Sequence, residues 1–226
     1  MDSKRKNMND DRINSFIKDL NENISSNYPK IATIFNLEYG YPELDPLRDE
    51  ICKCLICGLY QASITLTNHL LESSLKKCLA IKYSIDNKDN NSELENVFKD
   101  GIAIYDKCKL SETINKACSN GLIAKEQKKQ LNKFREEYRN PYSHAESAKI
   151  FNNNSLKGRS ISLIDGESSN DLLKRIFEPI TTELLIKDVL PIQGIAQAML
   201  AKEISAPYFF EVDKIIRAML ANLKVV

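Results

Sequence analysis

The sequence predicts an all-α fold, a bundle of helices with one short irregular insertion. Glycine and proline number only seven each among 226 residues, and both residues disfavour the interior of a helix. Apolar residues recur at intervals of three and four along most of the chain, which is the spacing of one helix face. The strict alternation that marks a half-buried strand is nearly absent. These three observations favour helices packed on helices.

The charge and hydrophobicity of the chain restrict the classes of protein it can be. Hydrophobic residues make up 42% and charged residues 28%, the usual mix of a globular domain. The formal net charge is +1, so nucleic-acid binding through overall positive charge is not indicated, whereas a local basic patch stays open. The polar start MDSKRKNMNDDR does not resemble a signal peptide, and no apolar run reaches about 18 residues. We expect a cytoplasmic protein with reduced thiols and no membrane partner.

The first half of the chain is predicted to hold a short helix, a connection and a long helix. Helical spacing covers residues 8–27, and four prolines and glycines predict irregular structure over residues 28–46. We treat residues 1–47 as this N-terminal part. A long helix is expected over residues 47–83. Its apolar stripe steps by three or four through Ile51, Leu55, Leu59, Ala62, Leu66 and Leu70.

Shorter helices complete the expected core, residues 48–150. A polar loop over residues 85–92 precedes a helix over residues 93–107. The next helix starts at LSETI and closes near Gly121, where glycine is a common helix end. Another covers residues 124–139.

Residues 151–226 are predicted to add an insertion and C-terminal helices that pack on the same bundle. The stretch near residues 151–168 is irregular or a β-hairpin, with SISLI as one arm. Two or three helices finish the chain, and Ser205 with Pro207 resembles a helix start. These helices belong to the core or a dimer interface, or they bind a partner.

The stretch RNPYSH, residues 139–144, interrupts the helical pattern. Pro141 has no amide proton and disfavours helical geometry at the residue before it, and Asn140 is a favourable N-cap. We therefore expect one helix to end near Arg139 and another to begin at Pro141. Arg139 and His144 then converge at a junction where free helix amides can receive an anion.

A polar face leads to this junction. Its members step by four, three and four residues: Lys128, Asn132, Arg135 and Arg139. Two interpretations remain open, a solvated helix face or a basic track toward the junction.

The motif and the helices before it resemble HEPN domains. Arg139 and His144 match the family's arginine–histidine motif, in the common form in which a polar residue, here Asn140, follows the arginine. The stretch GLYQASITLTNHLLESSLKKCL resembles the family's long helix, where an apolar stripe leads to a glutamate, here Glu72. The stretch from LSETINKACSNG to the motif resembles the restriction- and defence-associated group of the family. The resemblance covers about residues 48–148.

This resemblance implies a helical bundle that forms a homodimer with the two motifs near each other across the interface. Active members are metal-independent endoribonucleases, often toxins or effectors of phage defence, and they need no cofactor or metal. The implied partners are RNA, a second copy, and a cognate antitoxin or defence-system partner. Carried over by position, Arg139 and His144 are the catalytic pair, with Asn140 beside them. Lys128, Asn132 and Arg135 are then candidates to bind RNA.

The chemistry of the two motif residues agrees with that role. RNA is cut without a metal when its 2′-hydroxyl attacks the adjacent phosphate, which needs a group that transfers protons near neutrality and a fixed positive charge. His144 suits the first task and Arg139 the second. Some HEPN domains bind RNA, nucleotides or proteins without cutting. In such a module His144 would cap a helix or pack in a dimer.

Three further residues are candidates for supporting roles. Glu72 could orient Arg139 or His144, or it is a plain surface glutamate. Tyr142 could stack on a base, or it packs. His69 could contribute to a groove, or it packs on the long helix; with Glu72 alone it offers too few ligands for a metal.

Other chemistries find little support in the sequence. CKCLIC places Cys52, Cys54 and Cys57 inside an amphipathic helix, and no second cysteine pair or histidine pair follows at zinc-finger spacing. We interpret the cysteines as small buried hydrophobic residues. The sequence contains no P-loop, no dinucleotide-binding glycine motif, no serine-hydrolase elbow and no zincin motif.

Overall fold

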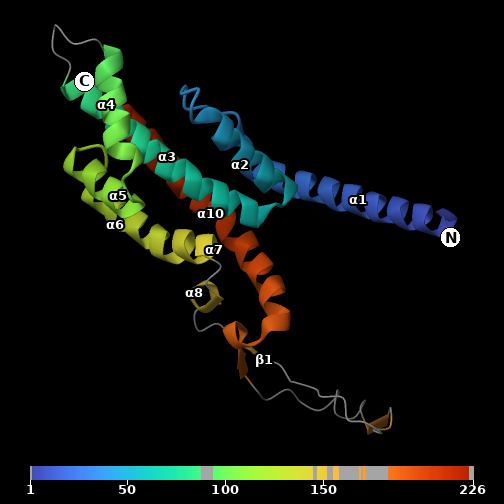
Figure 1. The fold of residues 1–226 in the computed structure, drawn as a ribbon. Helices are drawn as coiled ribbons and strands as arrows, with labels where there is room; N and C mark the ends of the chain where they lie inside the picture. The colour runs from blue at the N-terminus through green and yellow to red at the C-terminus, as the bar shows by residue number, and fades with distance from the viewer. Residues whose placement is uncertain are drawn as a thin grey trace.

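The chain is all-α in the computed structural model, as the sequence predicts (Figure 1). The residues that the structure describes are 2–87, 94–144, 147–151, 155–157, 168, 170–171 and 183–223. One small antiparallel pair joins β1 (Ser155–Lys157) to β2 (Glu183–Leu185). The predicted hairpin arm SISLI lies outside the described residues.

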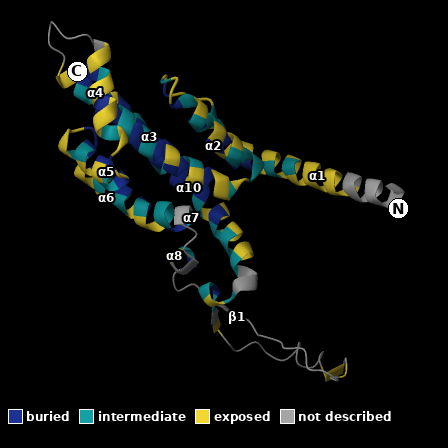
Figure 2. Cartoon of the chain, in the orientation of Figure 1, coloured by how far each residue is buried: buried dark blue, intermediate teal, exposed yellow. Residues whose placement is uncertain are grey.

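The first helix is longer than predicted. Helix α1 (Asp2–Phe35) continues through Pro29, so the irregular connection before the next helix is much shorter than residues 28–46. Ile31 lies two residues after the proline and is 1% exposed. Burial of such a side chain offsets much of the hydrogen bond that the proline removes. The N-terminal half of α1 projects from the bundle (Figure 1), and residues 11–19 within it are exposed (Figure 2).

The predicted long helix is in fact two helices, α2 (Asp45–Cys57) and α3 (Tyr60–Asp86). Gly58 ends α2 with φ +78°, and the amide of Leu59 donates to the carbonyl of Cys54 at 2.8 Å, which is a glycine-type helix end. A Cβ at position 58 would lie 2.8 Å from the side-chain amide nitrogen of Asn23. The turn therefore needs glycine for its conformation, and any larger residue would also displace the Asn23 side chain. It also breaks the predicted apolar stripe, and Leu59 is 55% exposed.

Helix α3 lies at the centre of the bundle, against α2, α4 (Leu94–Asp106), α5 (Leu110–Ser119) and α10 (Leu190–Leu223). Helices α4, α5 and α6 (Lys125–Phe134) occur where the sequence predicts them. The largest fully buried side chains are Phe151, Phe209, Ile31, Leu44, Ile51, Leu55, Ile64, Leu70, Leu71, Leu75, Leu79 and Ile114. Because they come from the N-terminal, middle and C-terminal parts of the chain, these parts share one core.

The C-terminal helices are also continuous. The prediction of a helix start at Ser205 and Pro207 is wrong, because α10 runs for 34 residues with Pro207 inside it. Ser205 is fully buried, and so is Phe209 just after the proline. Packing of this segment on α3 stabilises the helical path that the proline alone would disfavour.

A buried ionic cluster fixes α10 to the start of α2. Arg48 donates from Nε to Asp213 at 2.9 Å, and these side chains are only 3% and 5% exposed. The hydroxyl of Tyr39 donates to the same carboxylate at 2.8 Å, and Arg217 donates to its other oxygen at 2.8 Å. Both guanidinium groups lie over the Tyr39 ring, at 5.3 and 4.9 Å. Burial and the Asp213 carboxylate raise the pKa of Tyr39. Every charge in the cluster thus has a partner.

Candidate functional site

The chain stays helical through the motif, so the predicted break is wrong. Helix α6 passes into a π-helical segment, η1 (Arg135–Arg139), and then into α7 (Asn140–His144). Asn140 has φ −64° and ψ −49°, and its amide donates to the carbonyl of Arg135, five residues earlier. In an α-helix the ring of Pro141 would clash with the carbonyl four residues before it. The wider π-helical turn is the local solution that accommodates the proline.

A groove of about 430 Å³ opens beside η1. Its walls come from α3, from the connection between α4 and α5, from the start of α5, and from η1 with Asn140. Five basic residues line it: Lys76, Lys107, Lys109, Arg135 and Arg139. Glu72 and Asp106 are the acidic residues among the lining side chains. The groove is therefore a local basic patch on a chain of almost neutral net charge.

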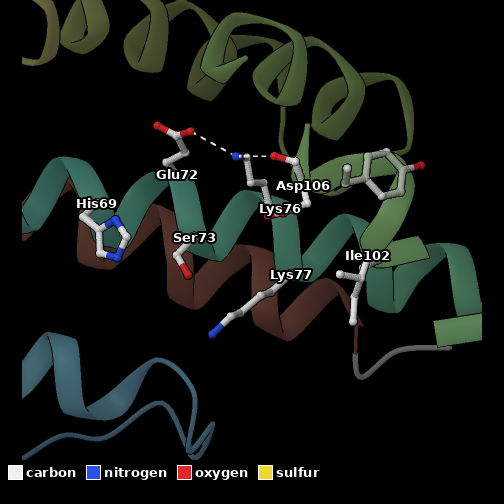
Figure 3. Close-up of a pocket in the computed structure, with 9 residues that line it drawn as sticks. His69, Glu72, Ser73, Lys76, Lys77, Ile102 and Asp106 are labelled. Carbon is white, nitrogen blue, oxygen red and sulfur yellow. Dashed lines mark hydrogen bonds and ion pairs between the residues drawn. The ribbon is translucent and has the colours of Figure 1, made fainter. Parts of the chain in front are cut away.

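Glu72 joins two of these cations. Its Oε2 lies 3.7 Å from Nη2 of Arg139, and its Oε1 lies 3.1 Å from Nζ of Lys76. Lys76 also donates to the carbonyl of Asp106 at 2.8 Å (Figure 3). Arg139 donates from Nη1 to Oδ1 of Asn140 at 3.4 Å. Glu72 therefore forms an ion pair with Arg139 across the bundle.

The start of a helix does lie at the groove, but it belongs to a different helix from the predicted one. Because η1 continues into α7, the amides around Pro141 do not begin a new helix. The start of α5, at Leu110 and Ser111, lines the groove instead. The first amides of a helix have no partner within it and carry the positive end of its dipole. They add to the attraction of the basic side chains for an anion.

Arg135 contributes to the same wall. Its Nη2 pairs with Glu136 at 3.1 Å, while its Nε is buried and has no hydrogen-bond partner among the residues that the structure describes. A buried donor left unpaired costs about 1–3 kcal/mol. The Nε of Arg135 can therefore still donate a hydrogen bond to an acceptor that binds in the groove.

The other predicted residues are distributed unevenly around the site. Lys128 and Asn132 lie on α6 and do not line the groove, and the Asn132 amide donates to the carbonyl of Lys128 within its own helix. Tyr142 is half-buried with its hydroxyl buried, and burial raises its pKa to about 12. It packs rather than offering a face to a base.

His69 is exposed and lines a neighbouring pocket. The side chain of His144 lies outside what the structure describes.

The cysteines behave as packed residues. Cys52 and Cys78 are fully buried, and burial raises the pKa of their thiols to about 11 and about 12. Cys54 is half-buried, and burial again raises its pKa. In the described ranges no three His, Cys, Asp or Glu residues gather as a metal site would require.

Sequence reasoning missed Lys76, Lys107 and Lys109. The only signal for them is the KCK stretch between two predicted helices, which places two cations beside a helix start. Lys76 gives no signal of its own, since it comes into the groove only through the packing of α3 on η1.

Fold and site together define an all-α protein with a basic groove beside a π-helical segment. No helix in the described part of the chain has an apolar stretch long enough to cross a bilayer. Comparisons with protein-family models, with curated proteins and with solved structures gave no match.

Proposed function

We propose that the protein is a metal-independent endoribonuclease of the HEPN type that holds the RNA backbone in the basic groove. The observation that supports this most is the gathering of five cations and the start of α5 around Arg139. RNA carries a negative charge on every phosphate, and most of the affinity of nucleic-acid binders comes from such contacts. Arg139 and His144 also match the family motif, which supplies the positive charge and the proton-transfer group that cleavage of RNA needs.

In this proposal Arg139 stabilises the reacting phosphate. Glu72 and Asn140 hold its guanidinium from two sides, at 3.7 and 3.4 Å, so that the charge is preorganised before RNA binds. His144 takes the proton of the 2′-hydroxyl as that oxygen attacks phosphorus, or gives a proton to the 5′-oxygen that leaves. The products are a 2′,3′-cyclic phosphate and a 5′-hydroxyl, so neither a metal nor a bound water enters the bond-breaking step.

The cellular setting is proposed on the resemblance alone. The protein acts in the cytoplasm, as a toxin or in phage defence, and a cognate antitoxin or defence-system partner controls it. RNA is the substrate.

We also propose that two copies pair. Large apolar side chains stand exposed along α1 and along the first half of α10: Ile13, Phe16, Ile17, Ile24, Ile195 and Met199. A second copy would cover them, and exposed patches of this kind mark interaction surfaces. By contrast, Tyr138 of η1 and Tyr142 of α7 are half-buried. The exposed apolar residues therefore support a pairing surface on α1 and α10, whereas the resemblance implies one at the motif.

The test of the activity is cleavage of RNA by the purified protein in EDTA. Arg139→Ala and His144→Ala should each slow cleavage by roughly 10²–10⁴-fold, with circular dichroism unchanged. Lys128→Ala, on α6 outside the groove, is the matched control and should cut at the wild-type rate. RNA that binds but stays intact would assign the chain to the non-catalytic binding modules. Cleavage that survives both motif substitutions would refute the assignment of the site.

A further inference from the structure

A second cavity adjoins the basic groove along α3. It has a volume of about 280 Å³ and shares three lining residues with the groove: Glu72, Lys76 and Asp106. Lys76 bridges Glu72 and the carbonyl of Asp106 between the two cavities (Figure 3). A ligand can therefore have one part in the groove and another in this cavity without leaving the protein surface.

The chemistry of the second cavity differs from that of the groove. Ile102 on α4 faces α3 across it (Figure 3), and Tyr105 and Ala80 extend its apolar wall. His69, Ser73 and Lys77 on α3 supply polar groups, in addition to the three residues shared with the groove. Ile102 is 55% exposed, so its apolar surface is open to a ligand. The cavity therefore has an apolar wall on one side and polar groups that can orient a ligand on the other.

Tyr105, one part of the apolar wall, is held in place by contacts with its neighbours. The Tyr105 ring meets Tyr83 edge to face at 6.5 Å, and the ammonium of Lys116 lies 5.3 Å from its centre. A wall fixed in this way loses little conformational freedom on binding, which favours affinity.

We propose that this cavity, here called the base pocket, receives the nucleobase of the nucleotide whose phosphate lies in the basic groove. The proposal rests on the proposed function, because the groove must hold an RNA phosphate. A nucleobase has flat apolar faces and a polar edge, which suit the apolar wall and the polar side chains of α3. The RNA must be single-stranded there, since the bases of a duplex are stacked and paired and cannot enter a pocket.

The experiment compares two RNAs of equal charge. One is a short single strand, and the other is the same strand with abasic nucleotides, each labelled for fluorescence anisotropy. The full-length protein carries His144→Ala so that the RNA stays intact. If a base fills the pocket, the strand with bases binds about 5- to 150-fold more tightly.

Two exposed isoleucines on α4 give a matched pair of variants. Ile102 lines the base pocket, whereas Ile104 lines neither cavity and is 43% exposed. Ile102→Ser should bring the affinities of the two RNAs together, and Ile104→Ser should leave their ratio unchanged.

The failures of the two proposals are separable. If both RNAs bind equally and Arg135→Gln weakens both, the groove binds phosphate and the base pocket is refuted. An unchanged ratio in Ile102→Ser refutes it as well. If the protein binds neither RNA, the proposed function fails, and the base pocket fails with it.

Discussion

Under the proposed function, the salt dependence of RNA binding measures how many groove cations reach phosphates. Arg135→Gln removes one of the five lining cations and leaves the contacts of Arg139 with Glu72 and Asn140 in place. Each contact with a single strand contributes about −0.7 to the slope of log affinity against log salt. Five contacts give a slope of about −3.5, and the variant should give about −2.8.

These slopes translate into large differences in affinity. Between 50 and 200 mM salt the wild type should lose about 130-fold in affinity and Arg135→Gln about 50-fold. Fluorescence anisotropy with an unstructured RNA at several salt concentrations measures both values. At low salt the variant binds more weakly than the wild type, and the two converge as salt rises.

Lys128→Gln is the control that tests the reasoning. The spacing on α6 predicts Lys128 as part of a basic track, whereas the structure leaves it outside the groove. Its removal should not change the slope. An unchanged slope in Arg135→Gln would show that Arg135 does not reach a phosphate and would refute the groove as the binding surface. A decrease of about 0.7 in the magnitude of the slope in Lys128→Gln would place RNA on α6 instead.

Three further predictions concern stability and assembly. Asp213→Ala leaves the buried Arg48 without its carboxylate partner and should lower the free energy of unfolding in urea by about 3–5 kcal/mol. As a control, Asp49→Ala breaks only an exposed ion pair and should leave the urea midpoint nearly unchanged. Burial raises the pKa of Cys78 from 9.0 to about 12. The thiol therefore ionises in the unfolded state before it ionises in the folded state as pH rises past 9. The free energy of unfolding then falls by roughly 4 kcal/mol by pH 12. Cys78→Ala should remove this part of the alkaline loss of stability, which urea titrations at several pH values measure. Phe16→Glu should shift the protein from dimer toward monomer in light scattering, whereas Lys18→Glu on the same helix should not. A wild-type protein that is monomeric at high concentration would contradict the proposed pairing surface.

Helices were predictable from apolar spacing, but their ends were not. Spacing continues unbroken from Leu55 through Leu59, so it gives no sign that Gly58 ends a helix. The evidence for the turn is the close approach of Asn23, which only tertiary packing creates. Pro207 gives the opposite error. Its local preference predicts a helix start, and burial of the helix around it on α3 overrides that preference.

The residues of the candidate site were likewise predictable only in part. Arg139 and Glu72 were found because the family resemblance places both, and the structure brings them within 3.7 Å. Lys107 and Lys109 come from the connection between α4 and α5, and their approach to η1 depends on how three elements pack on α3. Spacing within one helix carries no information on such convergence. It also led to Lys128, because Lys128 lies on α6, which packs against α5, whereas η1 packs against α3.

The proline of the motif acts on the site through the segment before it. Pro141 disfavours an ordinary α-helix, and the chain forms a π-helical turn over Arg135–Arg139 instead of a break. Both arginines that line the groove are the ends of this turn. The turn keeps them on one rigid helical path, with Arg139 near enough to Glu72 to be held. A break would have placed Arg139 at a frayed helix end, where a clamp for phosphate is less well preorganised. The π-helical turn thus gives a structural reason why an arginine, a polar residue and a proline follow one another at this point of the sequence.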